Sequence, residues 1–309
     1  MVLISEDSIS DDLDENVEKH EIKIHYHWIL FIFFMSYFFS YLIPSIIFML
    51  YIFFIFGPYF IQQDDFFLIF FNLDSLLALI LMPLVLIFCY FLRLVILAVI
   101  TRFFWSLTEK RSPTKDGIIP RNVPSKTLNY YHIRSFMIKY PKYMFTKGAF
   151  PWLTNWLYNY VGTNEIGGGT TIEEQICADK YIQVGNNCYI GVSSVLTSHL
   201  VEGIFGNVIY FKITVGDNVT FAGRNNFASG CQIQDNSYLL PDASGGKHYI
   251  VKGNNYYWGL PIRKIFKKKI CDYLKITEDD ILKAEELENK QKKLGKGKNP
   301  IYNDEEEEI

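Results

Sequence analysis

Residues 184–196 read VGNNCYIGVSSVL and residues 215–239 read VGDNVTFAGRNNFASGCQIQDNSYL, and both stretches repeat every six residues. A large apolar residue occupies the same slot of successive hexads, at Ile166, Ile172, Ala178, Val184, Ile190, Leu196, Val215, Phe221, Phe227, Ile233, Leu239, Val251 and Tyr257. This period fits neither an α-helix nor an antiparallel strand, but it is that of a hexapeptide β-helix. We therefore predict a parallel β-helix over residues 161–265, with three hexads to a coil and slot residues inward, in preference to an ordinary antiparallel β domain.

The first third of the chain has a different character. The 309 residues are 50% hydrophobic and 20% charged, yet residues 28–63 contain no charged residue or histidine, and residues 66–105 contain only Asp74, Arg93 and Arg102. A bilayer crossing needs about 20 apolar residues. We therefore predict two transmembrane helices within residues 26–105, rather than two buried helices of a soluble fold. The first should span 28–56 with an interruption in the form of a kink at Pro44 and an end at Gly57-Pro58, and the second should lie within 74–100.

Charge next to the spans predicts their orientation. Five cations follow the second span, at Lys110, Arg111, Lys115, Arg121 and Lys126, whereas the turn between the spans carries only acids. Positive charge near a span end marks the cytoplasmic side. The expected location is thus the cell membrane, with two spans and with the β-helix and both termini in the cytoplasm. Composition excludes a purely soluble enzyme and a multi-span transporter.

The remaining segments are less regular. Residues 1–25 form a polar acidic tail, and residues 106–160 form a basic, aromatic connector whose amphipathic pieces at 128–138 and 150–160 either lie on lipid headgroups or pack against the next domain. Residues 266–309 should hold a short surface helix at 277–294 and an acidic tail. The five cysteines lack metal-site spacing and are interpreted as reduced, packed thiols.

Several stretches resemble a known family. They are Thr163–Glu174, Val184–Glu202, Ile213–Gly230 and Tyr257–Ile262 (YWGLPI), the last being similar to the motif that closes the final coil there. Together they resemble the left-handed β-helix hexapeptide-repeat acyltransferases and, more narrowly, the membrane-attached acyltransferase-type domain of Pls-type non-ribosomal peptide synthetases. The resemblance implies a left-handed coil, a homotrimer, and transfer of an acetyl or other short acyl group. The donor would be acyl-CoA or an acyl carrier thioester, and the acceptor a hydroxyl or amine of a small molecule or envelope precursor.

His199 is the candidate catalytic base. It comes just after the slot residue Leu196 and before residues 202–214, which break the hexad frame, and in enzymes of this kind a loop leaves the coil beside an active-site histidine. A neutral imidazole can take a proton from the acceptor as it attacks the thioester carbonyl. Glu202 could accept a hydrogen bond from the other ring nitrogen and fix the tautomer. The alternative is a solvent-facing histidine at a coil corner.

The donor site is expected on five other residues: Gly223, Asn225, Gly259, Arg263 and Lys264. Asn225 and its neighbour Asn226 are candidates for stabilising the oxyanion. Arg263 and Lys264 contact either the phosphates of CoA or an anionic leaflet. The family's usual small residues are replaced by Ala222 and Ile262, which favours an alternative function, a catalytically inactive trimeric scaffold in a membrane biosynthetic complex.

Other cofactors and partners are not expected. Zinc enzymes of this fold need three histidines, and the repeat region has only His199 and His248, so no metal is predicted. No nucleic-acid motif is present. Five aromatic residues fall mostly outside the slots, and an apolar patch of this kind would favour a trimer: Tyr181, Tyr189, Phe205, Tyr210 and Phe211.

Overall fold

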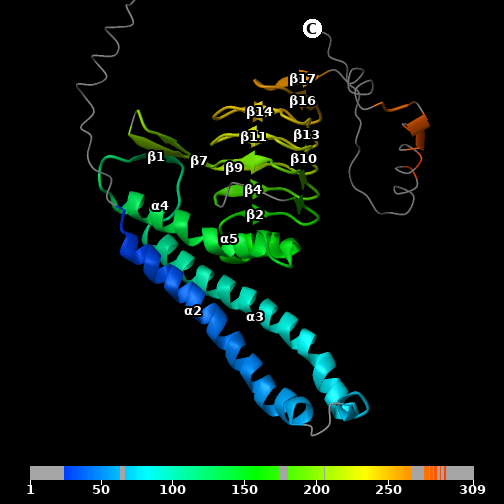
Figure 1. The fold of residues 1–309 in the computed structure, drawn as a ribbon. Coiled ribbons are helices and arrows are strands. Elements are labelled where there is room, and N and C mark those ends of the chain that lie inside the picture. The colour runs from blue at the N-terminus through cyan, green and yellow to red at the C-terminus, as the bar shows by residue number, and fades with distance from the viewer. Residues whose placement is uncertain are drawn as a thin grey trace, which may run out of the picture. The chain divides into compact units, whose positions relative to one another are not determined.

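The computed structural model describes residues 24–62, 67–173, 180–204 and 206–265, and isolated positions between 275 and 289. The chain divides into two compact units (Figure 1). Unit 1 comprises the residues up to Asn164 together with Val201–Val208, and unit 2 comprises Glu165–Leu200 and the residues from Ile209 onward. The terminal acidic tails, the inter-span acids and most of the expected C-terminal helix lie outside the described residues.

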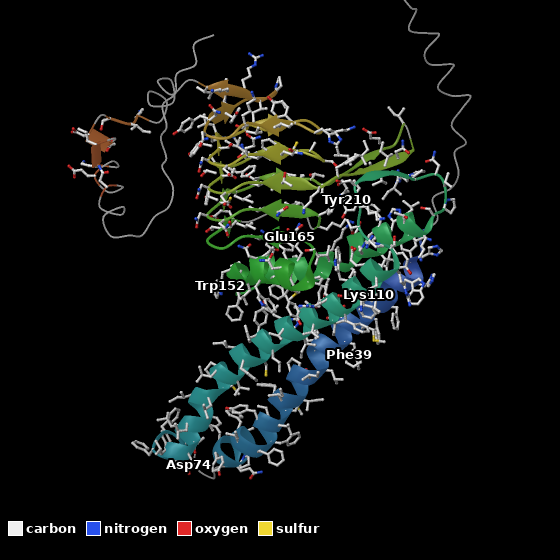
Figure 2. All side chains as sticks on the ribbon, turned by 180° about the vertical axis from the view of Figure 1, so that it is seen from behind. Phe39, Asp74, Lys110, Trp152, Glu165 and Tyr210 are labelled. Carbon is white, nitrogen blue, oxygen red and sulfur yellow. The ribbon has the colours of Figure 1, made fainter. Side chains whose placement is uncertain are left out.

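Unit 1 begins with a helical hairpin. Its first arm is the α-helix α2 (Tyr26–Tyr51), which continues as the π-helix η1 (Ile52–Ile61), and after the short η2 (Leu68–Phe70) the second arm is α3 (Leu73–Arg111). Both arms, of 36 and 39 residues, are long and apolar enough to cross a membrane. Large apolar side chains point outward along them, with Phe34 58%, Phe54 71% and Ile87 55% exposed. Figure 2 shows Asp74 at one end of α3 and Lys110 towards the other.

The end predicted for the first helix was wrong. The α-helix is not broken at Pro44, and helical structure continues past Gly57-Pro58 to Ile61. Proline removes one backbone donor, and a local change to i→i+5 bonding accommodates such a loss. In this segment the Gln62 N–H donates to the Gly57 carbonyl oxygen at 3.0 Å.

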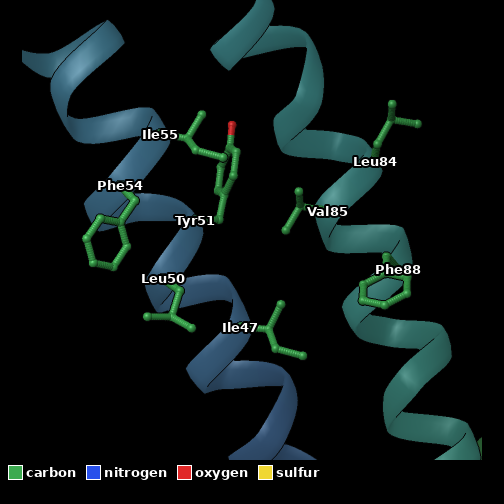
Figure 3. Close-up of a pocket in the computed structure, with 8 residues that line it drawn as sticks. All are labelled: Ile47, Leu50, Tyr51, Phe54, Ile55, Leu84, Val85 and Phe88. Atoms are coloured by element: carbon green, nitrogen blue, oxygen red, sulfur yellow. The ribbon is translucent and has the colours of Figure 1, made fainter.

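Few polar groups join the two arms of the hairpin. The Tyr51 hydroxyl donates to the Ala78 carbonyl oxygen, and Ser75 Oγ donates to the Tyr59 carbonyl oxygen at 2.5 Å. Between the arms lies a cavity of about 520 Å³, lined by Ile47, Leu50, Tyr51, Phe54, Ile55, Leu84, Val85 and Phe88 (Figure 3). Its only polar side chain, Tyr51, is the one already bonded to Ala78, so this cavity offers no group for catalysis.

The connector packs on the hairpin within unit 1. It contains β1 (Gly117–Pro120), α4 (Lys126–Met137), α5 (Lys139–Thr146), η3 (Pro151–Leu153) and α6 (Thr154–Val161). Ile133, Phe145 and Leu157 of these helices share a core with Leu94 and Trp105 of α3. Arg134, only 3% exposed, donates to the Glu109 carboxylate at 2.6 Å and to the Ser112 carbonyl oxygen at 2.7 Å. The amphipathic faces of these helices are therefore buried against the hairpin.

Unit 2 is a parallel β-helix of three stacked faces, as the hexads predict. One face carries β2 (Glu165–Ile166), β4 (Ile182–Val184), β9 (Ile213–Val215), β12 (Gln232–Ile233) and β15 (Ile250–Val251). The second carries β3 (Thr171–Ile172), β5 (Tyr189–Ile190), β10 (Thr220–Phe221), β13 (Tyr238–Leu239), β16 (Tyr256–Trp258) and β17 (Arg263–Ile265). The third carries β6 (Val195–Leu196), β11 (Asn226–Phe227) and β14 (Ser244–Gly245).

Strand register shows the length of one coil. Phe221 pairs with Leu239, and Leu239 pairs with Tyr257, each 18 residues further on, which is three hexads. Ile190 pairs with Phe221, 31 residues on, which is one coil plus 13 extra residues. All these pairs are parallel except β16 with β17, which is antiparallel. The parallel coil and the position of its single insertion are thus confirmed, while the left-handed sense stays a prediction.

The slot residues form one continuous core. Leu196, Phe221, Leu239 and Val251 are completely buried. Gly245 occupies a slot because Phe227, its partner in register, fills the space, and a Cβ on Gly245 would lie 2.8 Å from the Phe227 ring. Cys188 and Cys231 belong to the same core, and burial raises the pKa of both thiols, which keeps them protonated.

Asparagines take the left-handed backbone at one corner of the coil. Asn187, Asn218, Asn236 and Asn254 have φ of 53°, 55°, 57° and 57°. Their side chains form a ladder, with Asn218 Nδ2 donating to Asn236 Oδ1 at 3.1 Å and Asn236 Nδ2 to Asn254 Oδ1 at 2.9 Å. The glycines serve close approach instead, because a Cβ on Gly185 would lie 2.5 Å from the Gly216 carbonyl oxygen.

Candidate active site

The coil opens directly after the third face of its second turn. There β6 is followed by β7 (His199–Glu202) and β8 (Asn207–Tyr210) before the frame returns at Ile213. Buried Ser198 fixes the exit: its Oγ donates to the Lys180 carbonyl oxygen at 2.7 Å, and its own carbonyl oxygen accepts from Ser229 Oγ at 2.8 Å. The Phe211 N–H, on the returning strand, donates to the same carbonyl oxygen at 3.0 Å. His199 therefore begins its excursion from a rigid corner.

His199 packs against an aromatic ring. Its side chain is half-buried and its Nδ1 atom is shielded from solvent. The imidazole lies edge-on to Tyr210, with 6.4 Å between ring centroids, and Tyr210 packs on Tyr181 at 5.0 Å. Packing on a buried ring limits the orientations of the imidazole, which a general base needs. Tyr210 is labelled in Figure 2.

Lys180 is a neighbour that sequence reasoning missed. It is only 2% exposed, and its Nζ lies 5.3 Å from the centroid of the Tyr210 ring. A lysine this deeply buried is rare in proteins, and a cation over a tyrosine face is a recognised way to hold one. Its signal in the sequence was position: Lys180 precedes Ser198 by the 18 residues of one coil, so the stacking places it beneath the corner from which His199 departs.

Tyr210 also corrects the predicted apolar patch. Of the five aromatic residues, Tyr210 is 3% exposed and Tyr181 and Phe211 are half-buried, while Tyr189 is 38% exposed. Phe205 lies outside the described residues. Tyr210 is buried because the return strand β8 places its ring on Tyr181 and His199. The proposed trimer surface therefore cannot include all five rings.

Glu202 ends the strand that His199 begins. Its side chain is half-buried. On a regular strand, residues three apart face opposite sides, so β7 by itself does not turn Glu202 towards the imidazole. An orienting role for Glu202 stays a prediction, and the ring that packs on the imidazole is that of Tyr210.

Asn225 closes a corner of the coil, and its donor-binding or oxyanion role stays a prediction. It is completely buried, and its Nδ2 donates to the carbonyl oxygens of Leu240 at 2.7 Å and Ala243 at 3.1 Å. Its Oδ1 accepts from the N–H of Gly223 at 3.0 Å. Both ends of the amide are thus used inside the corner, and Gly223 (φ 134°) forms the turn that they close.

Asn226 is better placed to meet a substrate. It is exposed on β11 and pairs in register with Val195, four residues before His199. Neighbouring strands are about 4.8 Å apart, so the Asn226 backbone lies one coil from the strand that leads to the histidine. Its amide can donate to a developing oxyanion.

The other predicted donor residues lie at the last coil. Arg263 and Lys264 are exposed on β17, and Gly259 (φ 87°) is in the turn before it. Four strand spacings separate β17 from β5, which is about 19 Å along the coil axis. One chain therefore does not bring these cations to His199. Within the described ranges, no three His, Cys, Asp or Glu side chains gather where they could hold a metal ion.

Comparison with known proteins gives weak likenesses. No protein-family model matches the chain, and no curated protein matches it. Among solved structures it is similar to a hexapeptide-repeat acetyltransferase of Vibrio cholerae complexed with acetyl coenzyme A, with 16% identity over 40% of this chain and 81% of that chain and a TM-score of 0.35. It is also similar to the serine acetyltransferase of Neisseria gonorrhoeae in complex with serine, with 14% identity over 55% and 68% of the two chains and a TM-score of 0.28.

A third likeness is to a maltose O-acetyltransferase from Clostridium difficile 630, with 14% identity over 55% of this chain and 87% of that chain and a TM-score of 0.23. Identities and TM-scores this low assign neither fold nor activity. The assignment of unit 2 as a β-helix therefore rests on its own strand register.

Proposed function

We propose that the chain is a membrane-anchored acyltransferase of the hexapeptide-repeat type, with His199 as its general base. The observation that carries this proposal is the single break in an otherwise regular coil. It begins at a locked corner, and the first side chain beyond that corner is a packed imidazole. The narrower resemblance to the membrane-attached domains of Pls-type synthetases belongs to the same proposal.

The chemistry assigned to His199 is two proton transfers, one from the acceptor to the imidazole and one from the imidazolium to the leaving group. Its Nε2 removes a proton from the acceptor hydroxyl or amine while the acceptor oxygen or nitrogen bonds to the thioester carbonyl carbon. The tetrahedral oxyanion accepts a hydrogen bond from Asn226 or a backbone N–H. Collapse breaks the carbon–sulfur bond, and the imidazolium returns the proton to the leaving thiolate. The products are an ester or amide and a free thiol.

The donor contacts are assigned across a homotrimer. Arg263 and Lys264 are suited to the phosphates of CoA because both are exposed cations, but in one chain they lie away from His199 along the coil axis. In the proposed trimer, a neighbouring β-helix packed beside this one would form the second wall of the donor site. Apolar side chains left outward on unit 2 support such packing, with Tyr189 38%, Val192 46% and Ile250 55% exposed.

Thiol release tests the proposed activity. We expect the full chain in detergent to release free thiol from an acetyl- or other short acyl-CoA when hydroxyl and amine acceptors are supplied, well above the rate without protein. An assembled protein that releases thiol from no CoA thioester or acyl carrier thioester would contradict the enzyme and support the scaffold alternative.

Insertion of the hairpin gives a second expected result. In sealed right-side-out vesicles, a cysteine replacing Phe71, which is 86% exposed between the arms, should react with a membrane-impermeant maleimide. A cysteine replacing Lys115, exposed just after α3, should react only after permeabilisation. Both variants are made in a background whose native cysteines are replaced by serine. The reverse labelling pattern would show the opposite topology. Equal labelling of both cysteines in sealed vesicles would contradict insertion of the hairpin in the membrane.

A further inference from the structure

A second candidate site lies in unit 1, at the end of the hairpin where the first residues of α2 lie beside the last residues of α3. A cavity of about 760 Å³ opens between the start of α2, the end of α3 and the first turns of α4. We call it the basic cavity. Its polar lining includes Arg111, Lys126, His25 and His27, and none of its fourteen lining residues is acidic.

The charge of this cavity fits an anion. Arg111 and Lys126 are both exposed, so their charges are available to a ligand. The two imidazole rings, 5.6 Å apart, add ring N–H donors. Lys126 is the first residue of the twelve-residue α4, so the positive end of the helix dipole adds to the same field. Phosphate oxygens are the acceptors that such a set of donors binds well.

The opposite wall is apolar and continues away from the charges. Trp28, Ile32, Phe104, Leu107 and Ile133 line it. Ile32 and Ile133 also line a second cavity of about 300 Å³, formed by α2 between Ile29 and Ser36 and by residues 133–140 of α4 and α5. Ser36 lies nine residues beyond His27, about 13 Å along the helix. A hydrocarbon chain could therefore pass Ile32 and follow α2 while its headgroup stays with the cations.

We propose that these two cavities bind one anionic amphiphile, with a phosphate-bearing headgroup in the basic cavity and a hydrocarbon chain in the second. The inference rests on the proposed insertion of the hairpin, which places the basic cavity at headgroup level on the cation-rich side of the membrane. Trp28 at its rim is a residue typical of that level. A water-soluble phosphate would use the cations but would leave empty the second cavity, whose lining is apolar except for Ser36, Lys139 and Tyr140.

Titration of the purified full chain by native mass spectrometry in detergent tests the proposal. Dioleoyl phosphatidic acid should bind at least tenfold more tightly than dioleoyl phosphatidylcholine, and glycerol 3-phosphate should not displace it. The double variant Arg111→Gln/Lys126→Gln should weaken binding of phosphatidic acid about tenfold or more, because each cation near a lipid phosphate contributes appreciably. Lys110→Gln/Lys115→Gln removes equal charge from exposed positions outside the lining and should leave binding unchanged.

Three results would overturn the proposal. Equal losses of binding in the two double variants would show non-specific electrostatic attraction. Equal binding of the two lipids would show that the site does not recognise the phosphate headgroup. Displacement by glycerol 3-phosphate would show a site for soluble phosphates. The single variants Arg111→Gln and Lys126→Gln repeat the test if the double variant fails to fold. Because the readout is lipid binding, failure here leaves the role of His199 untouched.

Discussion

Replacing His199 with alanine should lower kcat/KM for acyl transfer about a thousandfold, within the range that general bases contribute. The coil should survive, because His199 is half-buried and lies outside the inward slots. Its neighbour Ser198 keeps the corner closed through hydrogen bonds that do not involve the imidazole. The measurement is thiol release from acyl-CoA, accompanied by the far-ultraviolet circular dichroism of the same preparation.

His248 provides a matched control. It is the other histidine among the described residues of unit 2, and it lies at a coil corner with φ of 53° beside Phe211, 4.6 Å between ring centroids. His248→Asn introduces a residue that tolerates the left-handed backbone, and this variant should retain activity within about twofold. Full activity in His199→Ala, or an equal loss in both variants, would remove His199 as the base.

The sequence predicts the coil well because its packing rule is local. Among the described residues, slot residues point inward and pair with the residue one coil away, so periodicity along the chain becomes contact across it. Phe221 and Leu239 show this directly. Gly245 is the one slot residue without an apolar side chain, and the ring of Phe227, one coil away, fills the space that such a side chain would take. The insertion before residue 215 is predicted in the same way, because it lengthens the spacing between successive slot residues.

The roles of single polar residues were less predictable. Asn225 was a candidate for the donor site because asparagine can serve an oxyanion, but its amide is used by Leu240 and Ala243, which lie one coil further on. Lys180 looked like an ordinary charged residue, yet stacking buries it over Tyr210. Which partner an amide or amine meets depends on neighbours 15 to 31 residues away, and composition alone does not contain that information.

The predicted end of the first helix was wrong for a similar reason. Gly57 and Pro58 are strong signals for ending an α-helix in water. Here the chain changes to π-helical bonding and continues, while the Tyr59 carbonyl oxygen accepts from Ser75 of the facing arm. In the bilayer that we propose for this hairpin, backbone groups have few other partners, and a helix there keeps its hydrogen bonds by local adjustment.

Truncating Phe221 to alanine should give the largest loss of stability in unit 2. Its ring is completely buried and packs edge-on against Phe227 at 5.6 Å. Phe→Ala in a core costs about 3–5 kcal/mol, and the rigid coil above and below limits collapse into the cavity. We expect the thermal midpoint of the β-sheet dichroism signal to fall by roughly 10 °C.

Tyr189→Ala is the control for this loss, because it removes a ring of similar size from the outer surface of the same face. Tyr189 is 38% exposed and pairs in register with Thr220, the residue before Phe221. Its truncation should cost less than about 1 kcal/mol of folding stability, as is usual for surface positions, unless the trimer surface covers it. A midpoint that drops with subunit dilution would reveal that case. If Phe221→Ala melted like the parent protein, the inward column of slot residues would not be what holds the coil together.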